Sequence, residues 1–262
     1  SMKNNGLDDN DLTISDDAVE AVIEYYTREA GVRKLEQQIG KICRKAVKKL
    51  LENTERPIEV TKQNLEEYLG KERFHFEKMN EHDEIGVARG LAWTSVGGDT
   101  LSIEVNVMPG SGKVELTGKL GDVMKESAMA AISYIRANSQ KLGIAENFHK
   151  TKDIHIHVPE GAVPKDGPSA GITMATAVVS ALTKNPVRND IAMTGEITLR
   201  GRVLPIGGLK EKSLAAFRAG ITDIIIPNEN KADIDDVPKE VRSKINFIPV
   251  KSMDTVLENA LR

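Results

Sequence analysis

The chain of 262 residues has one cysteine, few aromatic residues, no long apolar run and almost no net charge. The single cysteine, Cys43, excludes an internal disulfide framework and a cysteine-based zinc site, and it favours a reducing, cytoplasmic setting. The longest apolar runs, such as 221–227, fall far short of the roughly 20 residues that span a bilayer, and no signal-peptide pattern opens the chain. A net charge of −3 argues against a dedicated nucleic-acid-binding protein. With 40% hydrophobic residues, the composition is typical of one large or two modest folded domains.

The first part of the chain has the apolar spacing of helices. Residues 12–70 form three such stretches, separated at Gly31 and closed by Gly70, with a short strand expected at 58–60. The helix after Gly31 carries seven basic residues and one acidic residue within 31–50. That basic face is either solvated or meets a phosphate or an acidic partner.

Strands and glycine turns replace this pattern further along the chain. A polar stretch at 73–83 is interpreted as a linker, so we predict domains at 1–72 and 84–262, with residues 1–2 a remnant of an added tag. Strands on either side of Gly97-Gly98-Asp99 predict a hairpin. Helices and strands then alternate, which favours a mixed sheet over a purely parallel one. The elements expected are helices at 121–142, 169–182, 208–218 and 253–261 and strands at 85–94, 100–108, 113–117, 153–158, 191–194, 221–226 and 245–250.

The stretch Gly110–Lys113 resembles the end of a phosphate-binding loop. The full pattern requires a glycine where Val107 stands and a serine or threonine where Val114 stands. The stretch also lies between two strands rather than before a helix. We therefore interpret it as a hairpin turn and expect no complete ATP site in this chain.

The histidines are candidates for a metal site. His155 and His157 project from one face of a predicted strand, with His149 nearby. No third ligand of clear type stands beside them in the sequence. A polar sheet face or a supporting role is the alternative interpretation, and we expect no metal.

The run Gly167-Pro168-Ser169-Ala170-Gly171 has the G-x-S-x-G pattern of a nucleophile elbow. An α/β-hydrolase triad would need a histidine after the serine, yet all five histidines precede Ser169, and a Pro/Gly loop rather than a strand leads into it. Ser169 nevertheless opens a helix, where unpaired N–H groups and the helix dipole stabilise an oxyanion. A serine that merely caps the helix is the alternative.

Two kinds of base remain for Ser169. One is an upstream histidine paired with an aspartate. The other is a lysine kept neutral by loss of hydration: Lys212 has small or apolar neighbours on its helix, whereas Lys210 lies nearer the exposed edge. From periodicity alone, Lys212 is more simply a surface lysine. The histidine candidates are His155 and His157, with Asp153 or Asp166 as partner.

Three motifs together strongly resemble the ATP-dependent Lon protease family: PKDGPSAG at 164–171, MTGEITLRG at 193–201 and PIGGLKEK at 205–212. The resemblance continues through 226–231 and covers essentially the whole chain. It implies an α+β fold in which an all-helical small AAA+ subdomain precedes a mixed α/β proteolytic domain. It also implies a serine endopeptidase that degrades unfolded or damaged proteins.

The same motifs imply the roles of single residues. Ser169 corresponds to the nucleophile and Lys212, the second lysine of Leu-Lys-Glu-Lys, to the general base of a Ser–Lys dyad. Arg33, in Gly-Val-Arg-Lys-Leu-Glu, resembles the arginine of the small AAA+ subdomain that senses bound nucleotide. The supporting residues implied are Thr194, Asp166, Gly167 and Ala170.

The resemblance further implies cofactors and partners. The larger AAA+ subdomain with its phosphate-binding loop is expected outside this chain, so ATP and magnesium would be bound mainly there, and peptide hydrolysis itself needs no cofactor. The expected partners are unfolded proteins or peptides and further copies of the chain in a hexameric ring, with neither membrane nor nucleic acid. Two alternatives stay open: a serine peptidase with a histidine base, and a non-enzymatic Lon-like interaction module.

Overall fold

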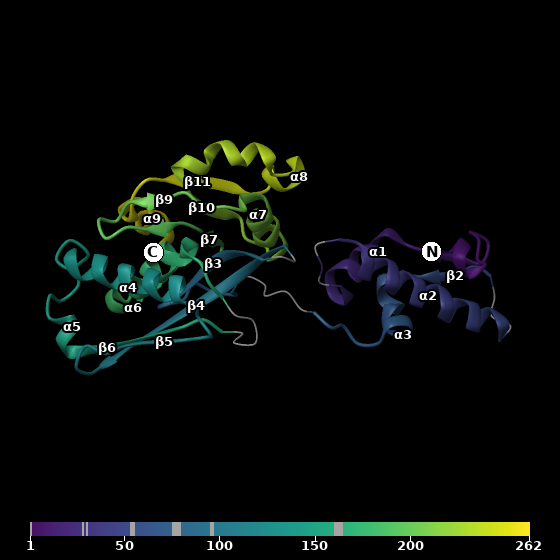
Figure 1. Ribbon diagram of the computed structural model, residues 1–262, viewed down its shortest axis with the longest axis horizontal. Coiled ribbons are helices and arrows are strands. Elements are labelled where there is room, and N and C mark those ends of the chain that lie inside the picture. The colour runs from purple at the N-terminus through teal and green to yellow at the C-terminus, as the bar shows by residue number, and fades with distance from the viewer. Residues whose placement is uncertain are drawn as a thin grey trace. The chain divides into compact units, whose positions relative to one another are not determined.

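The computed structural model describes residues 2–27, 29, 31–52, 56–74, 80–94, 97–159 and 165–262. The chain divides into two compact units, Ser1–Phe76 and Glu77–Arg262 (Figure 1). Each unit has its own hydrophobic core. The division falls within the predicted linker, of which residues 75–79, including His75, lie outside the described residues. In the part of the chain that is described, no helix is long and apolar enough to cross a bilayer.

The first unit is mostly helical and also contains a small parallel sheet. Its strands β1 and β2 pair with Leu12 opposite Ile58. Strand β2 is the short strand expected at 58–60. Its partner β1 is an addition to the all-helical unit that the family resemblance implies, because a strand of three residues is too short to show an alternating pattern. Its elements, with η marking a 3₁₀ or π turn, are η1 (Lys3–Asn5), β1 (Leu12–Ile14), α1 (Asp16–Ala21), η2 (Val22–Tyr26), α2 (Arg33–Leu51), β2 (Ile58–Val60), η3 (Lys62–Asn64) and α3 (Leu65–Leu69).

Part of the basic face of α2 binds the end of α3. Lys41 and Lys45 donate to the backbone carbonyl oxygens of Leu69 and Glu67 at 3.3 and 3.1 Å, and Lys49 donates to the Glu67 carboxylate at 2.7 Å. The three lysines recur every fourth residue, so they share one helix face. They satisfy carbonyl groups and offset the helix dipole at the C-terminus of α3. This part of the basic face therefore has its partners within the unit.

The described residues of the second unit form a seven-stranded mixed sheet in the order β11-β10-β7-β3-β4-β6-β5. Strands β11, β10, β7 and β3 are mutually parallel, β4 is antiparallel to both of its neighbours, and β5 is parallel to β6. This is the mixed sheet that the sequence predicts. The elements are β3 (Val87–Thr94), β4 (Gly97–Pro109), β5 (Val114–Thr117), α4 (Asp122–Ala137), α5 (Phe148–Thr151), β6 (Lys152–His157), η4 (Pro168–Ala170), α6 (Gly171–Thr183), β7 (Ile191–Met193), β8 (Glu196–Ile197), β9 (Val203–Leu204), α7 (Leu209–Arg218), β10 (Asp223–Pro227), η5 (Asn228–Asp236), α8 (Lys239–Arg242), β11 (Asn246–Val250) and α9 (Met253–Ala260).

Two predicted turns differ in the structure. The hairpin of β3 and β4 is present, but Gly97 already pairs with Thr94, so 97–99 belong to β4 and the connection at 95–96 lies outside the described residues. Gly110–Lys113 is not a hairpin turn, because β6 lies between the two strands that it connects. Glycines mark where a strand ends, but they do not reveal which strand pairs with which.

Helices cover both faces of the sheet (Figure 1). Helices α4, α6 and α9 share one core cluster with Ala88 and Ile225, whereas α7 and α8 share another with Leu91 and Ile224. Alternate residues of a strand point to opposite faces, so these clusters lie on opposite sides of the sheet. Helix α6, which follows Ser169, and helix α7, which carries Lys212, are thus separated by the sheet and can meet only beyond a strand end.

Candidate active site

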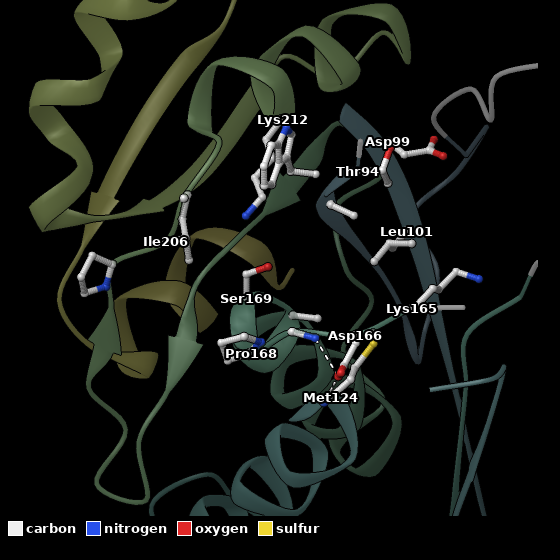
Figure 2. A pocket seen from close by; sticks show the side chains of 16 residues that line it. Thr94, Asp99, Leu101, Met124, Lys165, Asp166, Pro168, Ser169, Ile206 and Lys212 are labelled. Carbon is white, nitrogen blue, oxygen red and sulfur yellow. Dashed lines mark hydrogen bonds between the residues drawn. The ribbon is translucent and has the colours of Figure 1, made fainter. Parts of the chain in front are cut away.

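A cavity of about 480 Å³ opens where β3 ends, beside the end of its parallel neighbour β7. Its walls come from β3, the start of β4, the first turn of α4, the turn before α6, the segment leading into α7 and α7 itself (Figure 2). A crevice at the carboxyl ends of parallel strands is a common place for a site, because loops and helix ends converge there. Ser169 and Lys212 both line this cavity.

Ser169 lies in the 3₁₀ turn η4, which continues directly into α6. Gly167 precedes it with φ 118° and ψ 157°, a conformation that glycine adopts readily and other residues do not. The N–H of Gly195 donates to the Ser169 carbonyl at 2.8 Å, and the Gly195 carbonyl accepts from the N–H of Ile172 at 3.2 Å. The Ser169 side chain is half-buried and lies at the cavity wall (Figure 2).

Lys212 extends from α7 toward Ser169 (Figure 2) and is only 2% exposed. Its Nζ donates to Oγ1 of Thr194 at 3.0 Å. Leu209 and Ala216, which flank it at helical spacing, are buried as well. Burial removes water from the amine and lowers the pKa of Lys212 from 10.5 to about 8. Leu209 and Ala216, which the sequence places beside Lys212 on the helix, therefore contribute to an apolar environment for this lysine.

One dipeptide at the end of β7 holds both candidate residues. The buried Thr194 is fixed in the sheet by its N–H, which donates to the carbonyl of Ile225 at 3.1 Å. Its hydroxyl accepts from Lys212, while the next residue, Gly195, binds the backbone of Ser169. A single peptide unit anchored in the sheet therefore sets the separation between the Ser169 hydroxyl and the Lys212 amine.

Asp166 ties the turn before α6 to helix α4. Its Oδ1 accepts from the N–H of Met124 at 3.0 Å and from the N–H of Gly167 at 2.9 Å (Figure 2). Gly121 precedes α4 and has no side chain to cap it, and a Cβ there would overlap the Asp166 carboxylate. Asp166 thus caps α4 from another part of the chain. Ala170, the remaining predicted supporting residue, is buried and lines the cavity.

Family models match both parts of the chain. Residues 59–262 match the Lon protease (S16) C-terminal proteolytic domain, and residues 3–58 match the Lon protease AAA+ ATPase lid domain. The chain belongs to the Lon protease family. The junction of the two matches precedes α3, although α3 packs into the core of the first compact unit.

Bacterial Lon proteases are similar over nearly the whole chain. The identity is 58% over 260 residues with Lon protease 1 of Bacillus subtilis, 58% over 261 residues with the Lon protease of Clostridioides difficile, and 56% over 261 residues with that of Vibrio parahaemolyticus. Each comparison covers 99% of this chain and 33% or 34% of the relative. The chain thus spans about a third of the length of the curated Lon proteases that it matches.

Replacing Thr194 by valine should preserve the Lon fold and lower the rate of peptide cleavage by roughly one to two orders of magnitude. Valine has nearly the shape of threonine but lacks the oxygen that accepts the hydrogen bond of Lys212. The amine then loses the contact that holds it toward Ser169. The measurement is kcat/KM for a fluorogenic peptide, with the thermal unfolding midpoint as a check on the fold. A rate within twofold of the parent chain would contradict this role.

Several larger apolar residues that line the cavity around Ser169 and Lys212 are absent from the sequence-based predictions. Trp93, the only tryptophan of the chain, is 62% exposed and packs against Gly208 at the start of α7. Leu101, Met124 and Ile206 supply apolar walls. Apolar residues in strands and helices ordinarily mark the core, so these gave no distinct signal. The exposure of Trp93 is such a signal, but it becomes visible only in the folded chain.

Replacing Gly98 by alanine should destabilise the second unit by about 1–3 kcal/mol and impair cleavage, because the packing around it has no room for a methyl group. An added Cβ at Gly98 would overlap the backbone carbonyl oxygen of Glu211, so β4 would push α7 and its Lys212 outward. Urea unfolding and kcat/KM measure the two effects. Gly207→Ala, where the added methyl meets open space, is the matched control for stability. Equal unfolding midpoints for the two variants would refute the close approach of β4 and α7.

His155 and His157 lie away from the Ser169 cavity. They line a separate hollow of about 790 Å³, whose walls include residues of β3, β4 and β6. Thr117 Oγ1 lies 2.8 Å from His155 Nε2 and 2.6 Å from His157 Nδ1, so both rings are held by one hydroxyl. The structure thus does not bring either histidine to the wall that holds Ser169. Among the residues it describes, no three metal-binding side chains gather into one group.

The loop that resembles a phosphate-binding loop already holds a carboxylate. The N–H groups of Ser111, Gly112 and Lys113 donate to Oδ1 of Asp153 at 2.8, 2.9 and 2.8 Å. These backbone hydrogen bonds, that of Lys113 first, lower the pKa of the Asp153 carboxyl. The amides that a phosphate would need are occupied, and Asp153 is engaged away from Ser169.

Arg33 is the first residue of α2, and its side chain is exposed. The helix start beside it is capped by Glu29, whose carboxylate accepts from the N–H groups of Lys34 and Leu35, each at 2.8 Å. The predicted nucleotide-sensing role of Arg33 concerns the whole protein and stays a prediction.

Proposed function

We propose that the chain is the proteolytic module of an ATP-dependent serine protease, with Ser169 as nucleophile and Lys212 as general base. The observation that carries this proposal is the Lys212 amine, which is buried, has its pKa lowered to about 8, and is directed toward Ser169. A lysine in that state is the base that a serine hydroxyl needs when no histidine is at hand. Membership of the Lon protease family supports the assignment.

In the proposed mechanism, the neutral Lys212 amine accepts the proton of Ser169 Oγ while that oxygen attacks the scissile carbonyl. Backbone N–H groups at the start of the Ser169 helix stabilise the negative charge on the carbonyl oxygen. Protonated Lys212 then donates its proton to the leaving amine, and an acyl ester remains on Ser169. In the second half, Lys212 takes a proton from the attacking water and returns it to Ser169 Oγ as the ester breaks.

The remaining predictions concern the whole protein and belong to the same proposal. Its substrates would be unfolded or damaged proteins, and its copies would assemble into a hexameric ring in the cytoplasm. ATP and magnesium would be bound mainly by an AAA+ subdomain that carries a phosphate-binding loop, with Arg33 sensing the nucleotide. Peptide hydrolysis would need no cofactor. The domain limits proposed are 1–72 and 84–262, joined by the linker 73–83.

The experiment that tests this function is cleavage of an unfolded protein, such as fluorescein-labelled casein, by this chain without nucleotide. The expected result is release of fluorescent peptides, unchanged when ATP and magnesium are added. Binding of the labelled casein without any cleavage would instead support a non-enzymatic interaction module.

A further inference from the structure

Helix α4 presents a buried hydroxyl to the turn that carries Ser169. Ser127 is 7% exposed and lies on the apolar stripe of α4, next to the fully buried Ala128. A serine inside a helix commonly bonds to the carbonyl four residues earlier. Ser127 Oγ instead donates to the carbonyl oxygen of Pro168 at 3.3 Å, in the residue that precedes Ser169. This hydroxyl therefore acts on another segment rather than on its own helix.

The bond from Ser127 fixes the peptide unit between Pro168 and Ser169. A peptide unit is planar and trans, so its C=O and N–H point in opposite directions. The Pro168 carbonyl is held by Ser127 Oγ and also by the N–H of Gly171. The N–H of Ser169 is therefore directed away from α4.

Two further features show that this contact is built into the packing. Gly171 has no side chain, and a Cβ there would come within 2.8 Å of Ser127 Oγ, so only glycine lets the hydroxyl approach. Met124, one turn before Ser127 on the same face of α4, donates its N–H to Asp166. Helix α4 thus holds the nucleophile turn at two points, Asp166 and Pro168.

We infer that Ser127 is a positioning residue, which orients and polarises the Pro168–Ser169 peptide so that the Ser169 N–H stabilises the oxyanion. This inference rests on the proposed peptidase function. When negative charge develops beside that N–H, the peptide is polarised and its carbonyl oxygen becomes a stronger acceptor. Hydrogen bonds in such a chain strengthen one another. At 3.3 Å the bond from Ser127 is long in the free enzyme, and it can shorten as the charge forms.

The effect should therefore appear in the transition state rather than in substrate binding. Ser127→Ala should lower kcat for a fluorogenic peptide about tenfold, less than the loss of a direct oxyanion donor, and leave KM within twofold. A peptide boronate, whose tetrahedral adduct with Ser169 resembles the oxyanion, should bind about tenfold more weakly as well. The matching peptide amide, which forms no such adduct, should bind equally well to the parent chain and to Ser127→Ala. Ser127→Cys keeps a side chain of similar size with a weak donor, and its kcat should lie between those of the parent chain and Ser127→Ala.

The control is Ser139→Ala, which removes a serine hydroxyl of the same exposure just beyond the other end of α4. Its kcat, KM and boronate affinity should equal those of the parent chain. A kcat for Ser127→Ala within twofold of the parent, or a loss that appears wholly in KM, would overturn the inference.

Hydrogen exchange separates this inference from the proposed function. Amides of 165–171 should exchange several-fold faster in Ser127→Ala than in Ser139→Ala, because the turn has lost one of its two attachments to α4. If the parent chain cuts no peptide, the proposed function fails, and the exchange comparison still decides whether Ser127 holds the turn. Equal exchange in both variants would show that it does not.

Discussion

Replacing Ser169 by alanine is expected to lower peptide cleavage by at least about three orders of magnitude, and replacing Lys212 by alanine should do the same. The double variant should be no worse than either single one. The physical reason is that one proton transfer joins the two side chains, so removing either group removes the whole step. Rates of fluorogenic-peptide cleavage by the three variants, normalised to folded protein, measure this.

The matched control for the base is Lys210→Ala. Lys210 lies two residues away on the same helix, but its side chain is exposed, so it should be dispensable. Unfolding midpoints of the variants separate loss of chemistry from loss of fold. Additive losses in the double variant would contradict a shared mechanism, and full activity in either single variant would remove that residue from it.

The second large effect is on pH dependence. We expect kcat/KM to rise with pH as one group loses its proton, with an apparent pKa of about 8. The sign follows from the role of the group: a base is active only when unprotonated, and burial lowers the pKa of Lys212 from 10.5 because the charged amine loses its hydration. At pH 7 about one tenth of the enzyme would hold a neutral Lys212, so the rate would be about tenfold below its plateau.

Three variants identify the group responsible. Lys212→Arg should be inactive at every usable pH, because a guanidinium stays protonated. His155→Ala and His157→Ala should leave the pH profile unchanged, since both rings line a different hollow. If the profile shifts in a histidine variant while Lys212→Arg still cuts, the base is a histidine.

Local sequence patterns predict most of the helices and strands and the candidate site residues. Alternation in β6 predicts Ile154 and Ile156 on the buried face with His155 between them, as the structure has it. Helical spacing gives Lys212 small or apolar neighbours, but from periodicity alone it is more simply a surface lysine, whereas the structure leaves it only 2% exposed. The Lon motifs supplied the family and the order of the site residues. The predictions of β6 and of the family are confirmed because alternation and motifs depend on residues that are close in the chain.

How these parts meet depends on contacts between segments that are distant in the sequence. Strand pairing placed β6 between β4 and β5, so Gly110–Lys113 is not a hairpin turn, and the pairing of Gly97 with Thr94 put residues 97–99 into β4. Packing put α6 and α7 on opposite faces of the sheet. At the end of β7, Thr194 binds the Lys212 amine of α7, and Gly195 binds the backbone of Ser169, just before α6. The lowered pKa of Lys212 depends on what covers it from other elements, and the hydroxyl of Ser127 reaches Pro168 across 41 positions of sequence. Burial and hydrogen bonds between distant segments arise from the packing of the whole domain, and local sequence does not specify them.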